Sequence, residues 1–173
     1  DSYLLSYREF IQYFARLAEI SVHDFVIGSH FTYGWMPTIL ELKQPFEDIS
    51  IEQTLTGAAK FLNKVKRKEQ LERVELQFLI SVINNSLVGV SKLIHFISPD
   101  QYAIWDSRVC RFVFRREPYQ QMVNNIDNYY AYLDNCAKLA ADADFPRLYR
   151  SVVDKIGYDV SQYRALEWIM FIL

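Results

Sequence analysis

The sequence predicts an all-α fold, with about eight helices in one domain that spans residues 1–173. The chain is 51% hydrophobic and has only five Gly and five Pro residues, and so few chain breakers favour long helices over many short strands. Apolar residues recur at helical spacing, as Phe10, Phe14 and Leu17 do near the N-terminus. Capping patterns such as the one at Ser50 and Gln53 precede several of these stretches.

The predicted elements follow in chain order. The first helix covers residues 3–20. An irregular, aromatic stretch at residues 30–37 comes next, and a short helix then ends before Pro45, because proline cannot continue it. Further helices are expected at residues 51–66, 69–86, 87–97, 107–114, 119–141 and 145–156, and a last one starts near residue 159.

Three further local signals predict where helices begin and end. Ser6 and Glu9 have the spacing of a capping box in the first helix. Asp106 precedes residues 107–114 as a predicted N-cap. Gly157 follows the helix at residues 145–156 as a predicted C-terminal cap.

Composition and charge narrow the classes of function. The net charge of −2 excludes a chain-wide basic surface for nucleic acid but not a local basic patch. Cys110 and Cys136 match no metal-ligand spacing and no disulfide framework, so we expect two free thiols, no metal and no cofactor. No apolar run reaches the roughly 18 residues of a membrane span, and no leader pattern opens the chain. We therefore expect a cytoplasmic protein without a membrane partner.

The segment from residue 91 to residue 112 gathers residues that can do chemistry. Lys92 lies in an apolar helix, where burial lowers the pKa of an amine, and a neutral amine can attack a sugar carbon or a carbonyl group to form a Schiff base. Asp106, at a helix N-terminus, could act as a base or stabilise a developing cation. Three cations that follow share one helical face and could hold phosphates: Arg108, Arg111 and Arg115.

The strip Ala103-Ile-Trp-Asp106-Ser-Arg-Val-Cys-Arg111-Phe resembles the catalytic-aspartate strip of helix-hairpin-helix DNA glycosylases. Val88-Gly-Val-Ser-Lys92 is similar to the hairpin that carries the catalytic lysine in the 8-oxoguanine glycosylase branch. The strip is even more similar to that of small bacterial or phage all-helical proteins of unassigned activity that are related to this fold. The resemblance implies that Lys92 is a nucleophile and that Asp106 assists it.

The resemblance also implies a two-lobed arrangement of helices. Lobe one would hold about residues 1–49 together with 117–173, and lobe two about residues 50–116. An extruded base would lie between the lobes and stack on Trp35 or Trp105.

Each candidate residue also has a purely structural interpretation. Asp106 could be a helix cap without chemistry. Lys92 could extend its amine to the surface from an apolar helix. The arginines at 108, 111 and 115 could form a solvated, salt-bridged face. The aromatic loop with Tyr33 and Trp35 could fold back into the groove between the lobes.

Two functions stay open, and the sequence does not decide whether the chain is an enzyme. The first is a nucleic-acid-acting protein, a base-excision glycosylase or lyase with Lys92 and Asp106 as its catalytic residues. The alternative is a non-catalytic binding module, an accessory or defence-related protein that keeps the fold without the chemistry. The mild acidity favours it, and so does the presence of Gly89 alone where the family hairpin has two glycines. A protein partner would then bind the loop with Tyr33 and Trp35.

Overall fold

The computed structural model describes residues 2–36 and 38–173. This described part is all-helical, with ten helices instead of about eight. Their bounds are α1 (Ser2–Arg16), α2 (Val22–Trp35), α3 (Ile51–Lys66), α4 (Arg73–Val82), α5 (Leu87–Ile97), α6 (Ser107–Phe114), α7 (Gln120–Val123), α8 (Ile126–Ala140), α9 (Phe145–Ile156) and α10 (Gln162–Ile172). In the described residues, no helix is long and apolar enough to cross a membrane.

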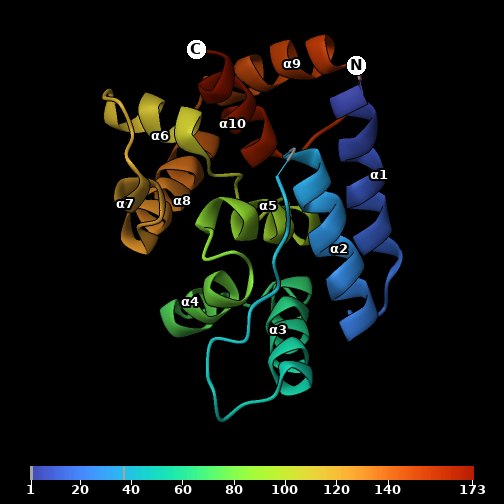
Figure 1. Ribbon diagram of the computed structural model, residues 1–173. Coiled ribbons are helices and arrows are strands. Elements are labelled where there is room, and N and C mark those ends of the chain that lie inside the picture. The colour runs from blue at the N-terminus through green and yellow to red at the C-terminus, as the bar shows by residue number, and fades with distance from the viewer. Residues whose placement is uncertain (1, 37) are drawn as a thin grey trace.

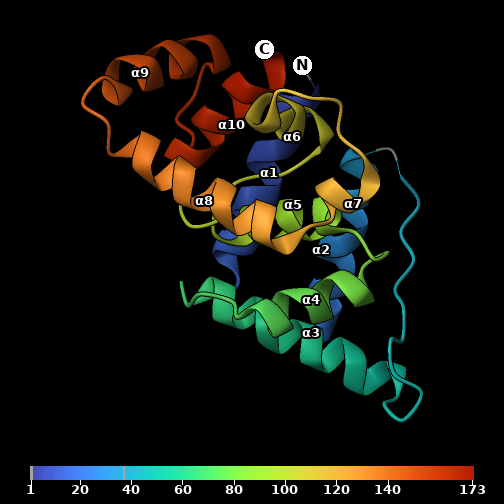
Figure 2. The same ribbon diagram turned by 90° about the vertical axis from the view of Figure 1, so that its left-hand side faces the viewer.

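Helix α5 lies at the centre of the molecule (Figures 1 and 2). It packs against α1, α2, α3 and α4, while α10 packs against α6, α8 and α9. Contacts between α4 and α8 join the two groups of helices. One large cluster of buried side chains draws on both groups. The division of the chain into two lobes stays a prediction.

Several helix ends form where the sequence predicts them. The side chains and backbone N–H groups of Ser50 and Gln53 bind each other reciprocally, so the capping box of α3 is confirmed. Asp106 caps α6. Gly157 ends α9 with a φ of 86°, in the left-handed region that glycine adopts without strain.

The aromatic stretch at residues 30–37 was predicted wrongly as a loop. Helix α2 continues to Trp35, and its start is fixed by a capping box between Ser21 and Asp24. Apolar residues surround this helix on most sides, so the sequence shows no clear period of 3.6 residues. The predicted turn at Pro37 lies outside the described residues.

Other predicted boundaries also shift. No helix forms between residues 38 and 50. Ser6 lies inside α1 and donates a hydrogen bond to the carbonyl of Ser2, so it is not an N-cap. The predicted helix at 119–141 is divided into α7 and α8, because Asn125 caps the start of α8.

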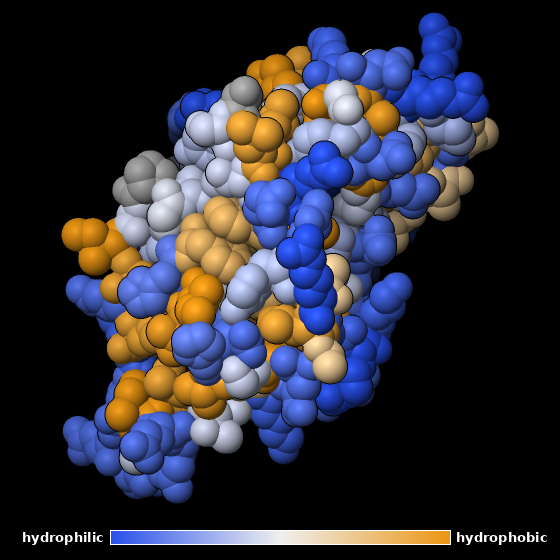
Figure 3. All heavy atoms as spheres, turned by 90° about the vertical axis from the view of Figure 1, so that its right-hand side faces the viewer, coloured by the Kyte–Doolittle hydropathy of each residue, from blue (hydrophilic) through white to orange (hydrophobic). Residues whose placement is uncertain are grey.

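The surface that carries α1 and α2 is shown in Figure 3. Apolar side chains gather in the lower part of this view, among hydrophilic ones.

Candidate active site

A cavity of about 520 Å³ lies where α2, α5, α6 and α10 come together, and we call it the lysine cavity. Its volume falls in the range of small-molecule sites, roughly 300–1,000 Å³. Lys92 from α5 and Asp106 from the start of α6 both line it. The other lining residues are Tyr3, Trp35, Met36, Ile104, Arg108, Arg164, Glu167, Trp168 and Phe171.

Lys92 is held in surroundings that disfavour its charged form. Burial lowers the pKa of its amine, while the carboxylates of Asp106 and Glu167 oppose this shift without cancelling it. The amine nitrogen lies 5.8 Å from the centre of the Trp35 ring. The side chain is therefore half-buried and lines the cavity beside an indole.

Asp106 caps helix α6 and also lines the lysine cavity. Its Oδ1 atom accepts hydrogen bonds from the backbone N–H groups of Arg108 at 2.9 Å and Val109 at 3.0 Å. The residue is only 9% exposed and lines the lysine cavity. Because both capping bonds use the same oxygen, the cap does not occupy the other oxygen, Oδ2, of this carboxylate.

Ser91 connects the two candidate residues through the backbone. Its hydroxyl accepts a hydrogen bond from the N–H of Trp105 at 3.1 Å and lies 3.1 Å from the carbonyl of the same residue. Ser91 precedes Lys92 and Trp105 precedes Asp106. The relative placement of the amine and the carboxylate is therefore fixed by a buried polar contact next to both.

Arg164 and Glu167 form a buried ion pair that the sequence analysis missed. They lie one turn apart on α10, and Nη1 of Arg164 donates to Oε2 of Glu167. Glu167 is 2% exposed, and burial raises the pKa of its carboxyl group although Arg164 opposes this shift. Both are charged residues in an otherwise apolar stretch of α10. Lys92 was singled out because it is a charged residue in an apolar helix, and the same signal could have identified this pair.

Aromatic rings lie close to the two cations Arg164 and Lys92 that line the cavity. The guanidinium carbon of Arg164 lies 4.7 Å from the centre of the Tyr7 ring, 5.3 Å from that of Trp168 and 5.7 Å from that of Trp35. Trp35 thus has two cations near its ring, since the Lys92 amine is also close. Its indole N–H is buried and has no hydrogen-bond partner among the described residues, so it is a donor at the edge of the site.

The predicted arginine face is divided between two places. Arg108 lines the lysine cavity, and its guanidinium carbon lies 4.6 Å from the centre of the Phe171 ring. Arg111 and Arg115 do not line that cavity, but they share a neighbouring groove with Arg108. Arg111 also forms an exposed ion pair with Glu117.

Two aromatic residues do not lie where the sequence analysis placed them. Trp105 is fully buried, and its indole N–H donates to the carbonyl of Val123 at 2.8 Å, so its ring is part of the core and offers no face to a base. Tyr33 is a buried residue of α2 and not part of an exposed loop, so the proposed partner-binding loop with Trp35 does not exist. Trp35 itself lines the lysine cavity.

The segment that resembles a glycosylase hairpin lies in the first turns of α5. Gly89 is inside the helix, and a Cβ atom there would lie 2.8 Å from ring carbons of Tyr33. Its role in this fold is therefore close packing of α2 on α5. The turn before α5 instead uses Asn84 and Asn85 in the left-handed region, and the amide of Asn84 donates to the carbonyl of Ile39.

Titratable groups outside the cavity are mostly structural. Cys110 and Cys136 are free and buried, as predicted. His95 is fully buried between Tyr7 and Tyr102, and burial lowers its pKa to about 3. No group of His, Cys, Asp and Glu side chains that could hold a metal ion occurs among the residues the structure describes.

Comparisons of the chain with protein-family models, with curated proteins and with solved structures found no match.

Proposed function

We propose that this chain is a nucleic-acid-acting enzyme that excises a base or opens an abasic site through Lys92. One observation supports this above all others: the Lys92 amine and the Asp106 carboxylate line the same cavity. The lowered pKa of Lys92 supports it as well, because only the neutral amine has a free electron pair for attack.

The reaction follows from the groups present. The Lys92 nitrogen forms a bond to C1′ of the sugar, and the bond between C1′ and the base breaks. The departing base takes the bonding electron pair and then a proton, while the attacking nitrogen loses one. The bond between C1′ and O4′ then breaks, O4′ takes its electron pair and a proton, and the nitrogen lone pair forms the protonated Schiff base on Lys92. Asp106 places its negative charge beside the cation that develops on the sugar.

The aromatic residues of the cavity supply the binding energy for a base. Trp35, Trp168 and Phe171 offer flat apolar faces, on which an extruded base can stack. Arg108 lies over Phe171 at the edge of the cavity, where it could pair with the phosphate of the same nucleotide.

Borohydride trapping on DNA that contains an abasic site tests the role of Lys92. Reduction of the Schiff base should give a covalent adduct with the wild-type protein and none with Lys92→Gln. The matched control is Lys60→Gln, which removes an exposed lysine on α3. The proposal is wrong if wild type forms no adduct, or if the adduct persists in Lys92→Gln while circular dichroism shows a folded protein.

Asp106→Asn separates capping from chemistry. Asparagine is as good an N-cap as aspartate, so α6 should stay folded while the negative charge is lost. Removal of one electrostatic group from an active site typically slows the reaction by about a hundredfold or more. We expect a similar decrease in the single-turnover rate of adduct formation, with unchanged thermal unfolding.

The packing role of Gly89 favours a second candidate function. In the glycosylase hairpin, glycines let the backbone come close to a DNA phosphate. Gly89 instead packs against Tyr33, so it is not available for such a contact. A non-catalytic module that binds nucleic acid or protein is the corresponding alternative. Salt-dependent DNA binding without an adduct in wild type would support that alternative.

A further inference from the structure

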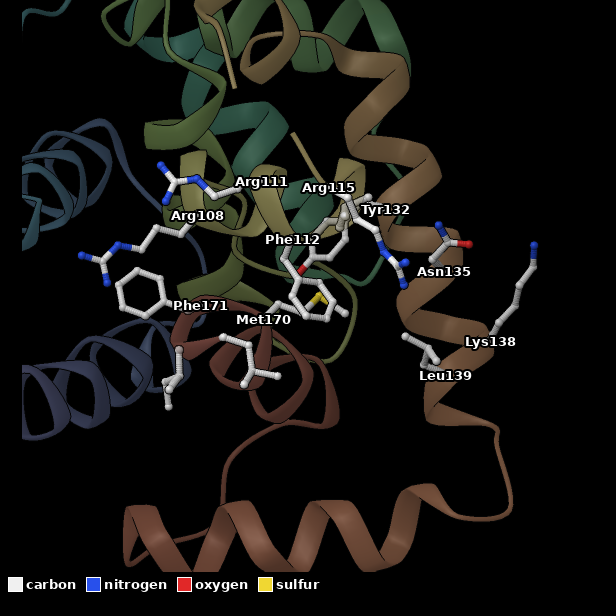
Figure 4. A pocket seen from close by; sticks show the side chains of 13 residues that line it. Arg108, Arg111, Phe112, Arg115, Tyr132, Asn135, Lys138, Leu139, Met170 and Phe171 are labelled. Atoms are coloured by element: carbon white, nitrogen blue, oxygen red, sulfur yellow. The ribbon is translucent and has the colours of Figure 1, made fainter. Parts of the chain in front are cut away.

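A second groove of about 770 Å³ lies between α6, α8 and α10, and we call it the arginine groove (Figure 4). Arg108 and Phe171 line both this groove and the lysine cavity, so the two sites are neighbours. A ligand that fills one can continue into the other past these two side chains.

The arginine groove is basic. Its lining includes Arg108 and Arg111 from α6, Arg115 directly after that helix, and Lys138 from α8, and no Asp or Glu side chain among the described residues. Figure 4 shows Arg108 and Arg111 at one end of the groove, Arg115 near Phe112 in its middle, and Lys138 at the other end. Positive charge at both ends suits an extended polyanion better than a single small anion.

One acidic residue stands close to these cations. Glu117 accepts a hydrogen bond from Arg111 at 2.9 Å, and the two side chains are 81% and 57% exposed. An ion pair this exposed contributes little to stability. A phosphate can therefore replace Glu117 as the partner of Arg111.

The middle of the groove is apolar. Phe112, Leu139 and Met170 line it between the basic ends. Phe112 and Leu139 are 40% and 44% exposed, so their side chains are accessible to a ligand. A nucleotide strand combines phosphates with flat apolar bases, and single-strand binding sites use the same combination of cations and aromatic rings.

We propose that the arginine groove binds the nucleic-acid strand whose sugar reaches Lys92, and that this strand is single-stranded there. Its phosphates contact the two basic ends, and one unpaired base stacks on Phe112. The path of the strand toward Lys92 rests on the proposed function. The binding of single-stranded nucleic acid in the groove does not depend on the chemistry of that lysine.

Fluorescence anisotropy with a labelled poly-dT oligonucleotide tests this proposal. The variant Arg115→Gln/Lys138→Gln removes two cations of the groove, and Arg16→Gln/Lys60→Gln removes two exposed cations from α1 and α3. Between about 50 and 200 mM salt, each lost phosphate contact should reduce the slope of log affinity against log salt by about 0.7. We expect a reduction of about 1.4 for the groove variant and none for the control.

Phe112→Ala tests the stacked base. Loss of one stacking ring should weaken binding of the oligonucleotide about tenfold and leave the salt slope unchanged. An unchanged slope in the groove variant overturns the proposal. The proposal is also overturned if a polyglutamate peptide binds as tightly as poly-dT and its affinity is unchanged in Phe112→Ala. The groove would then be a site for acidic peptides.

The two proposals can fail separately. The binding assay reports on the arginine groove, which Lys92 does not line, and the trapping assay reports on Lys92 in the lysine cavity. Absence of a trapped adduct together with the expected salt slopes refutes the enzymatic function alone. An adduct in wild type together with equal slopes in all variants refutes the strand path alone.

Discussion

The hydroxyl of Ser91 accepts a hydrogen bond from the backbone N–H of Trp105 at 3.1 Å. These two residues directly precede Lys92 and Asp106 in the chain, although 14 positions separate them. Ser91 is fully buried, and a buried contact of this kind is not exchanged for water. The geometry of the lysine cavity thus depends on a serine that does not line it.

Ser91→Ala should therefore lower both stability and reactivity. It leaves the buried N–H of Trp105 without a partner, which costs about 1–3 kcal/mol in the free energy of unfolding. Urea denaturation measures this loss, and the trapping assay should show a slower adduct. Ser151→Ala, which alters an exposed serine on α9, is the control and should change neither. Equal stability of the two variants would contradict the role of Ser91.

The titration of Lys92 predicts a dependence of stability on pH. Its pKa in the folded state is below the ordinary lysine value of 10.5, so between these two values the unfolded state binds more protons. Stability must then rise as the pH increases from the folded pKa of Lys92 toward about 10.5. Lys92→Met lacks this contribution. The free energy of unfolding of wild type minus that of Lys92→Met should therefore increase with pH, and a flat or falling difference would refute the lowered pKa.

The pair of Arg164 and Glu167 should show strong energetic coupling. Arg164→Met leaves a buried carboxylate without its partner, and such changes typically destabilise a protein by about 3–5 kcal/mol. Arg164→Met/Glu167→Met removes both charges and should recover a large part of that loss. A double-mutant cycle by chemical denaturation measures the coupling. Additive effects of the two single substitutions would show that the pair is not a unit.

His95 should make the protein sensitive to acid. Its Nδ1–H donates to the carbonyl of Tyr102 at 2.6 Å, so Nε2 accepts from the Tyr7 hydroxyl at 2.9 Å and the ring is neutral. The pKa is lowered from 6.5 to about 3, so stability falls as the pH drops below 6.5. At about pH 5 the loss should be about 2 kcal/mol. In urea titrations, the free energy of unfolding of His95→Gln should therefore decrease less than that of wild type between neutral pH and about pH 5.

The sequence predicts best what depends on local interactions. The cap at Asp106 and the end of α9 at Gly157 need only residues within one turn, and both are confirmed. The boundaries of α5 are confirmed for a similar reason, because its apolar run has clear ends. Lys92 and Asp106 were chosen as partners from sequence, and the structure brings them to one cavity.

The failures concern residues whose environment is made by distant parts of the chain. Trp105 was expected to stack on an extruded base, yet Val123 and α8 enclose it. Helix α2 lacked a polar face because other helices cover it on several sides. Arg164 joins the site from the other end of the chain, and no pattern around residue 106 could point to it.

Gly89 has no side chain at the place where α5 packs against Tyr33 of α2. A side chain at Gly89 would collide with the hydroxyl of Tyr33, and Tyr33 belongs to the same last turn of α2 as Trp35. An alanine at position 89 would require the Tyr33 side chain to shift. Gly89 thus leaves the space that the Tyr33 ring occupies between α2 and α5, although Gly89 itself does not line the lysine cavity.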